Sequence, residues 1–104
     1  MQLNRLQQLL DMLKETPSDP FLIYATGVEY EALGDLSKAR LFFDELLTNH
    51  ADYLPTYYKY GIMLALDGET ERAEDILGKG IELAGKIGDM KTLRELRTAL
   101  ENMD

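Results

Sequence analysis

The chain has 104 residues, 45% of them hydrophobic and 29% charged, a balance typical of one globular domain with a single core. Eleven basic against nineteen acidic residues leave a net charge of −8, so we expect nucleic acid and anionic membranes to be poor partners. The absence of cysteine excludes disulfides, thiol catalysis and cysteine-based zinc sites. No long apolar run lies near the N-terminus, so neither a signal peptide nor a transmembrane segment is expected there.

Hydrophobic residues recur every three or four positions along most of the chain, which is the spacing of amphipathic helices. No segment alternates between apolar and polar residues with the period of two that a half-buried β-strand shows. We therefore predict an all-α chain of about six helices joined by short connections. In chain order, the helices are expected over residues 3–13, 20–33, 36–49, 53–66, 71–83 and 89–104.

The predicted boundaries carry residues that are common at helix ends. Short polar side chains accept hydrogen bonds from the first free backbone N–H groups, and proline suits the first helical position. Glycine suits the position after the last turn, where the backbone often becomes left-handed. The expected helix starts are Asp19 before Pro20, Asp35 or Ser37, Thr70, and Asp89. The expected stops are Gly34, Gly68, and Gly85 with Gly88.

The chain repeats itself at a step of 34 residues, with no insertion between the two copies. Glycine inside a helix costs about 1 kcal/mol relative to alanine, a cost that is tolerated where a neighbouring helix must come close. Each unit is then a hairpin of two helices that must stack on a neighbour to cover its apolar face. We expect two alanines to supply the small face opposite the helical glycines. The identical pairs are Tyr24/Tyr58, Gly27/Gly61, Gly34/Gly68 and Ala39/Ala73.

This pattern resembles the tetratricopeptide repeat, a helical hairpin of 34 residues. Its small and aromatic positions match at Gly27, Tyr30, Gly34, Ala39 and Phe43, and again at Tyr57, Gly61, Gly68 and Ala73. The chain departs from the family pattern at Ile23, Thr26, Ala51, Leu64, Leu77 and Gly85.

The resemblance implies an α-α superhelix, a solenoid of helical hairpins with a capping helix at each end. The N-terminal helix is then either a cap or the second helix of a degenerate repeat. The implied single domain comprises an N-terminal helix in residues 1–16, repeats over 20–53 and 54–87, and a C-terminal capping helix over 89–104.

The sequence offers little catalytic chemistry. The single histidine, His50, is expected at a helix end, where a cationic side chain suits the helix dipole, and no nucleophile motif accompanies it. The acidic groups follow neither the di-iron nor the calcium-loop spacing, and the glycines form no phosphate-binding loop. We therefore expect no enzyme activity, no cofactor and no metal, and an enzyme that uses His50 is the weakest alternative.

The resemblance also implies that the first helices of the two units line a concave groove for a peptide or a partner helix. Tyrosine is common in such interfaces, although Tyr24 and Tyr58 can equally pack against the chain's own helices. The lysine and asparagine clamp of chaperone-binding members is absent, because Tyr24, Val28 and Lys59 stand at its positions. The implied groove residues are Phe21, Tyr24, Val28, Glu31, Ala32, Tyr58, Lys59, Ile62 and Ala65.

Two functions follow from these expectations. The first is a protein–protein interaction module or scaffold that binds a protein or peptide in the groove and needs neither nucleic acid nor membrane. The alternative is a structural self-association module, because two repeats leave apolar ends that a second copy can cover in a homodimer. The missing targeting signals and cysteines favour a cytoplasmic location.

Overall fold

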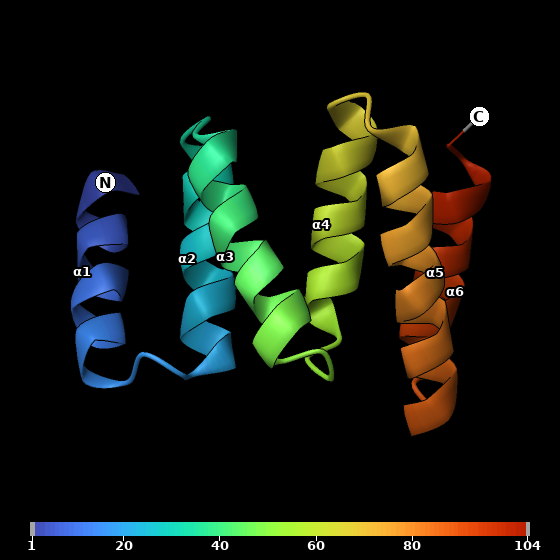
Figure 1. Ribbon diagram of the computed structural model, residues 1–104, viewed down its shortest axis with the longest axis horizontal. Helices are drawn as coiled ribbons and strands as arrows, with labels where there is room; N and C mark the ends of the chain where they lie inside the picture. The colour runs from blue at the N-terminus through green and yellow to red at the C-terminus, as the bar shows by residue number, and fades with distance from the viewer. Residues whose placement is uncertain (1, 104) are drawn as a thin grey trace. The chain divides into compact units, whose positions relative to one another are not determined.

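A computed structural model of the chain describes residues 2–103, and the side chains of residues 4–103. Within these residues the chain is helical and contains no strand, which confirms the predicted all-α class (Figure 1). The side chain of Leu3, predicted to belong to the first apolar stripe, lies outside the described residues. The helices are α1 (Gln2–Glu15), α2 (Pro20–Ala32), α3 (Leu36–Asn49), α4 (Pro55–Leu66), α5 (Thr70–Ile87) and α6 (Met90–Glu101).

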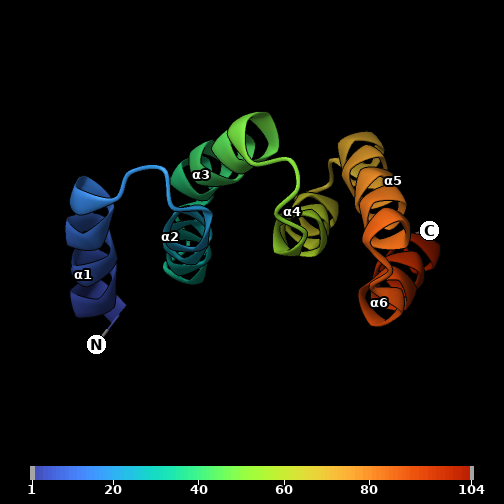
Figure 2. The same ribbon diagram turned by 90° about the horizontal axis from the view of Figure 1, so that it is seen from below.

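The six helices form two compact units, Met1–Tyr53 and Leu54–Asp104. In the first unit, α2 and α3 form an antiparallel hairpin, and α1 packs against α2 alone (Figure 2). In the second unit, α4 and α5 form the hairpin, and α6 packs mainly against α5 and also reaches α4. The second unit therefore has a third helix that touches both members of its hairpin.

Side-chain caps start three of the helices, as predicted. The Asp19 carboxylate accepts a hydrogen bond from the backbone N–H of Phe21 at 2.9 Å. Asp35, rather than the alternative Ser37, accepts one from the N–H of Lys38 at 3.1 Å. Asp89 accepts from the N–H of its partner three residues later at 3.0 Å, and so satisfies a donor that the helix itself leaves free.

Two predicted starts are wrong in detail. α4 begins at Pro55 rather than at residue 53, because proline suits the first helical position and has no N–H to satisfy. α5 is preceded by Glu69, which makes no side-chain cap, and Thr70 is already its first helical residue. These boundaries are therefore set by the backbone of the preceding turn rather than by a capping side chain.

The left-handed stops are confirmed at Gly34 and Gly68, whose φ angles are 85° and 82°. The predicted turn at Gly85 is wrong, because α5 continues to Ile87 and ends only at Gly88, where φ is 80°. The buried Ala84 packs the last turn of the helix into the unit, so its neighbour Gly85 stays helical. The helix stops where the backbone becomes left-handed, and that position is Gly88.

The helical glycines allow the close approach that the repeat predicts, but their nearest partners are large. A Cβ on Gly27 would lie 2.8 Å from Cε1 of Phe43, and one on Gly61 would lie 2.5 Å from Cδ2 of Leu77. The expected alanine partners are buried, yet they do not supply the nearest atoms. Each glycine is therefore a notch that receives a bulky side chain of the second helix, at equivalent positions in both units.

The N-terminal helix is fastened to its unit by one buried apolar residue and one ion pair. Leu9 is buried, and Nε of Arg5 lies 3.1 Å from Oε1 of Glu29 on α2. The Glu29 side chain is only 9% exposed, whereas Arg5 lies largely in solvent. Arg5 therefore supplies the charge that compensates a carboxylate placed inside the unit.

Candidate functional site

The first-unit residues predicted for the groove lie on α2 with partly accessible side chains. Phe21 is exposed, and Val28 and Glu31 are half-buried. The remaining aromatic residue, Tyr24, packs within its own unit, with its ring centroid 6.2 Å from that of Phe43. No ligand contact tests these residues, so their part in binding stays a prediction.

Tyr24 has a second aromatic neighbour in the loop that follows α3. The centroids of Tyr24 and Tyr53 lie 5.7 Å apart. Burial raises the pKa of the Tyr24 phenol, and the nearby Tyr53 and Glu31 add to the effect. Burial also raises the pKa of Tyr53, with a smaller contribution from Asp19. The pair is therefore held as neutral phenols in a small aromatic cluster.

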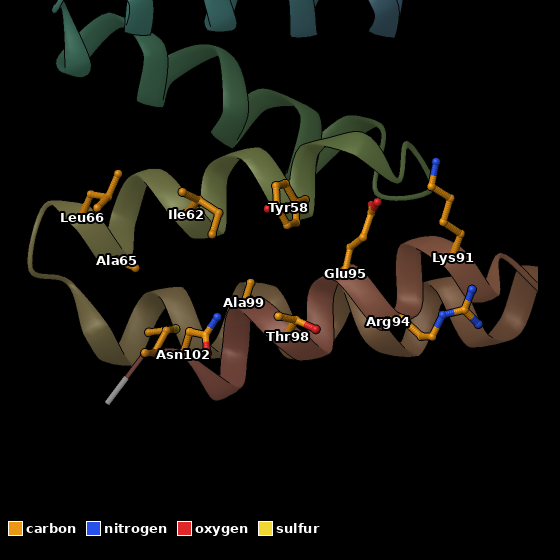
Figure 3. A pocket seen from close by; sticks show the side chains of 11 residues that line it. Tyr58, Ile62, Ala65, Leu66, Lys91, Arg94, Glu95, Thr98, Ala99 and Asn102 are labelled. Carbon is orange, nitrogen blue, oxygen red and sulfur yellow. The ribbon is translucent and has the colours of Figure 1, made fainter.

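The second-unit residues of the prediction behave differently. Tyr58, Ile62 and Ala65 lie on one face of α4 and line a groove between α4 and α6, hereafter the α4–α6 groove (Figure 3). Tyr58 is 43% exposed, although it is a large aromatic residue. Lys59, the fourth predicted residue, is half-buried and does not line the groove.

The α4–α6 groove has a volume of about 580 Å³, within the range of sites that hold small ligands or peptide side chains. Figure 3 shows α4 and α6 running in the same direction, so the groove has two distinct ends. Its α4 wall ends at Leu66, which is 84% exposed. The complete lining is Tyr58, Ile62, Ala65, Leu66, Lys91, Arg94, Glu95, Thr98, Ala99, Asn102 and Met103.

Charge is confined to one end of this groove. Lys91, Arg94 and Glu95 stand on the N-terminal half of α6, at the end where α4 contributes Tyr58 (Figure 3). None of the three forms an ion pair with any residue between 4 and 103. The other end, around Leu66 and Asn102, is lined without charged side chains.

The start of α6 is fixed by Asp89, next to these charges. Its carboxylate accepts hydrogen bonds from the backbone N–H and the hydroxyl of Thr92, at 3.0 and 2.8 Å. These bonds, the backbone one first, hold the pKa of Asp89 below its usual value, and Lys91 adds a smaller effect. The carboxylate is thus engaged with its own helix, and the position of α6 beside α4 is anchored at this end.

No catalytic arrangement occurs in the part of the chain that the structure describes. His50 follows α3 as its C-terminal cap, and its backbone N–H donates to the Leu46 carbonyl at 2.7 Å. Within the described residues, no three acidic or histidine side chains are grouped to hold a metal ion. The α4–α6 groove, apolar with a charged end, has the character of a binding surface.

The α6 wall was missed at the sequence level, where this helix was treated as a cap with a solvated polar face. One signal could have found it. A further step of 34 residues from Ala65 reaches Ala99, which lies opposite on α6 and lines the same groove. A third copy of the first-helix position was therefore visible, but only by extending the repeat beyond its two full units.

Two solved structures are similar to this chain. A crystal structure of a tetratricopeptide repeat domain protein from Salinibacter ruber has 35% sequence identity and a TM-score of 0.78, and the match covers 82% of this chain and 96% of that one. A solution NMR structure of such a protein from the same organism has 35% identity and a TM-score of 0.81, covering 85% and 89%. No family model and no curated protein matches the chain. Among the described residues, no helix has the length and apolarity that spanning a membrane requires.

Proposed function

The chain belongs to the tetratricopeptide repeat family, whose domains are general protein–protein interaction modules and typically non-catalytic scaffolds, and we propose that it holds a segment of a partner protein in the α4–α6 groove. The supporting observation is the groove itself, which leaves large apolar side chains in solvent. Tyr58 and Leu66 stay exposed although the unit has a packed core beside them. A partner that covers them removes apolar surface from water, at about 25 cal/mol per Å².

Binding can be tested without knowing the natural partner. A random library of displayed 12-residue peptides is selected against the whole chain, and the affinity of the enriched peptides is measured by fluorescence anisotropy. The double variant Tyr58→Ala/Leu66→Ala removes two apolar walls of the groove. We expect it to weaken binding by at least about tenfold, since covering one leucine contributes about 1.5–3 kcal/mol and 1.4 kcal/mol is a factor of ten.

The matched control removes equally exposed apolar side chains elsewhere. Leu41 on α3 is 68% exposed and Ile87 at the end of α5 is also exposed, and neither lines the groove. The variant Leu41→Ala/Ile87→Ala should bind the selected peptides within about twofold of the original chain. If both double variants weaken binding equally, or if neither does, the groove is not the binding site.

Self-association is the competing function for the same apolar surface. Sedimentation at several concentrations, from low to high micromolar, distinguishes the two. A dimer that the Tyr58→Ala/Leu66→Ala variant abolishes would show that a second copy covers the groove. A monomer over the whole range leaves the groove available for a partner protein, as we propose.

A further inference from the structure

We propose that the segment held in the α4–α6 groove is amphipathic and acidic, with apolar side chains on the floor of the groove and at least one carboxylate at Lys91 and Arg94. This inference rests on the proposed function and adds the chemistry and the direction of the partner. It is carried by the distribution of charge along the groove.

The basic pair, Lys91 and Arg94, is unusual for this chain. The chain carries a net charge of −8, yet the groove lining holds two positive side chains against one negative, Glu95. Both members of the pair are exposed, and neither forms an ion pair within residues 4–103. Their charge is therefore available to a ligand rather than spent on holding the fold.

The nearby acidic groups do not cancel this charge. Asp89 lies two residues before Lys91, but its carboxylate accepts two hydrogen bonds from Thr92. Glu95 points toward the same end of the groove as Lys91 in Figure 3, without pairing with it. More distant acidic residues act weakly on a bound segment, because charges are screened over about 8 Å at physiological ionic strength.

The charged end gives the groove a direction. A segment lying in it meets Lys91, Arg94 and Tyr58 at one end, and Leu66 and Met103 near the other. The walls run over roughly three turns of helix, about 12–16 Å, at a rise of 1.5 Å per residue. That length accommodates about four or five extended residues or two to three helical turns. A carboxylate at the basic end and apolar residues beyond it fit this pattern, and the reverse order does not.

The peptide selection described above also tests this inference. We expect the enriched peptides to combine two or more apolar residues with a net negative charge. The variant Lys91→Glu/Arg94→Glu should weaken their binding by about tenfold or more, because it replaces attraction by repulsion at the same positions. Raising the salt concentration should weaken binding to the original chain and should not weaken binding to this variant.

The control reverses the same two residue types outside the groove. Lys86 on α5 and Arg97 on α6 are exposed and do not line it, so Lys86→Glu/Arg97→Glu gives the chain the same net charge. This variant should bind within about twofold of the original chain. Circular dichroism of both variants must show the original helix content and melting transition.

The outcomes separate this inference from the proposed function. Enriched peptides that lose affinity with Tyr58→Ala/Leu66→Ala, but are neutral or basic, leave the groove as the site and overturn the acidic partner. Acidic peptides that weaken equally with both charge reversals overturn it too, because they report the overall charge. A library that yields no groove-dependent peptide, or a groove-dependent dimer of the chain itself, overturns both proposals.

Discussion

Gly80 lies where the three helices of the second unit meet, and its replacement by alanine is expected to be costly. A Cβ there would lie 2.6 Å from Cβ of Tyr57 on α4 and 3.1 Å from Cδ1 of Leu96 on α6. Ordinary carbon contacts are about 3.5–4.0 Å, so a helix must move by roughly 1 Å. The Cβ of Tyr57 is fixed to its backbone, and both partners are buried, so no change of rotamer relieves the overlap.

The magnitude follows from two opposing terms. Overpacking a close-packed core costs about 1–3 kcal/mol, and a clash with a fixed Cβ belongs at the upper end. Alanine recovers about 1 kcal/mol of helix propensity relative to glycine. We therefore expect Gly80→Ala to lower the free energy of unfolding by about 2 kcal/mol. For a domain of this size, that lowers the melting temperature by roughly 8–16 °C.

Gly78 provides the matched control two residues away on the same helix. A Cβ on Gly78 would meet no atom within 4 Å, so Gly78→Ala gains helix propensity without a clash. It should raise the free energy of unfolding by up to about 1 kcal/mol. Urea unfolding followed by circular dichroism measures both variants. If Gly80→Ala proves as stable as the original chain, the close packing of α4, α5 and α6 around this position is wrong.

Three further variants test the ends and the aromatic cluster. Arg5→Ala should lower the free energy of unfolding by about 1 kcal/mol because it leaves the Glu29 carboxylate uncompensated, and a double-mutant cycle with Glu29→Gln should recover part of that loss. The raised pKa values of Tyr24 and Tyr53 mean that the unfolded chain loses these protons first, so stability should fall as pH rises above about 10, and Tyr24→Phe/Tyr53→Phe should flatten that fall in urea titrations. The lowered pKa of Asp89 means that its contribution is complete above about pH 4 and is lost at lower pH as the folded carboxylate is protonated; melting curves of Asp89→Asn should lack this acid dependence.

Local signals in the sequence were sufficient for the helices and for the repeat. Gly34 and Gly68 end their helices as predicted, because a left-handed residue after the last turn is a property of the local backbone. Gly85 was misplaced because a glycine near a helix end can be either a stop or an interior residue. Only tertiary packing, here the burial of Ala84, decides between them.

The binding surface was half predicted because it depends on a pairing between helices that no local signal reports. Tyr58 was found from its place in the repeat, and it lines the groove. Tyr24 has the same repeat position but packs against Phe43 and Tyr53, and an aromatic residue at a helical face reads the same in both cases. Lys91 and Arg94 were interpreted as a solvated face, because only the contact between α4 and α6 makes that face a wall.

Gly80 connects the stability of the second unit to its binding surface. The residues that a Cβ on Gly80 would displace, Tyr57 and Leu96, directly adjoin Tyr58 on α4 and Glu95 on α6, which line the groove. Moving either helix by about 1 Å alters the spacing of the two walls. Gly80→Ala should therefore weaken the selected peptides severalfold at a temperature where the variant is still folded, whereas Gly78→Ala should leave their affinity unchanged. Equal affinities for the two variants, measured by anisotropy on chains with the same helix content, would mean that the groove tolerates this displacement and that its walls need not be held by the packing beneath them.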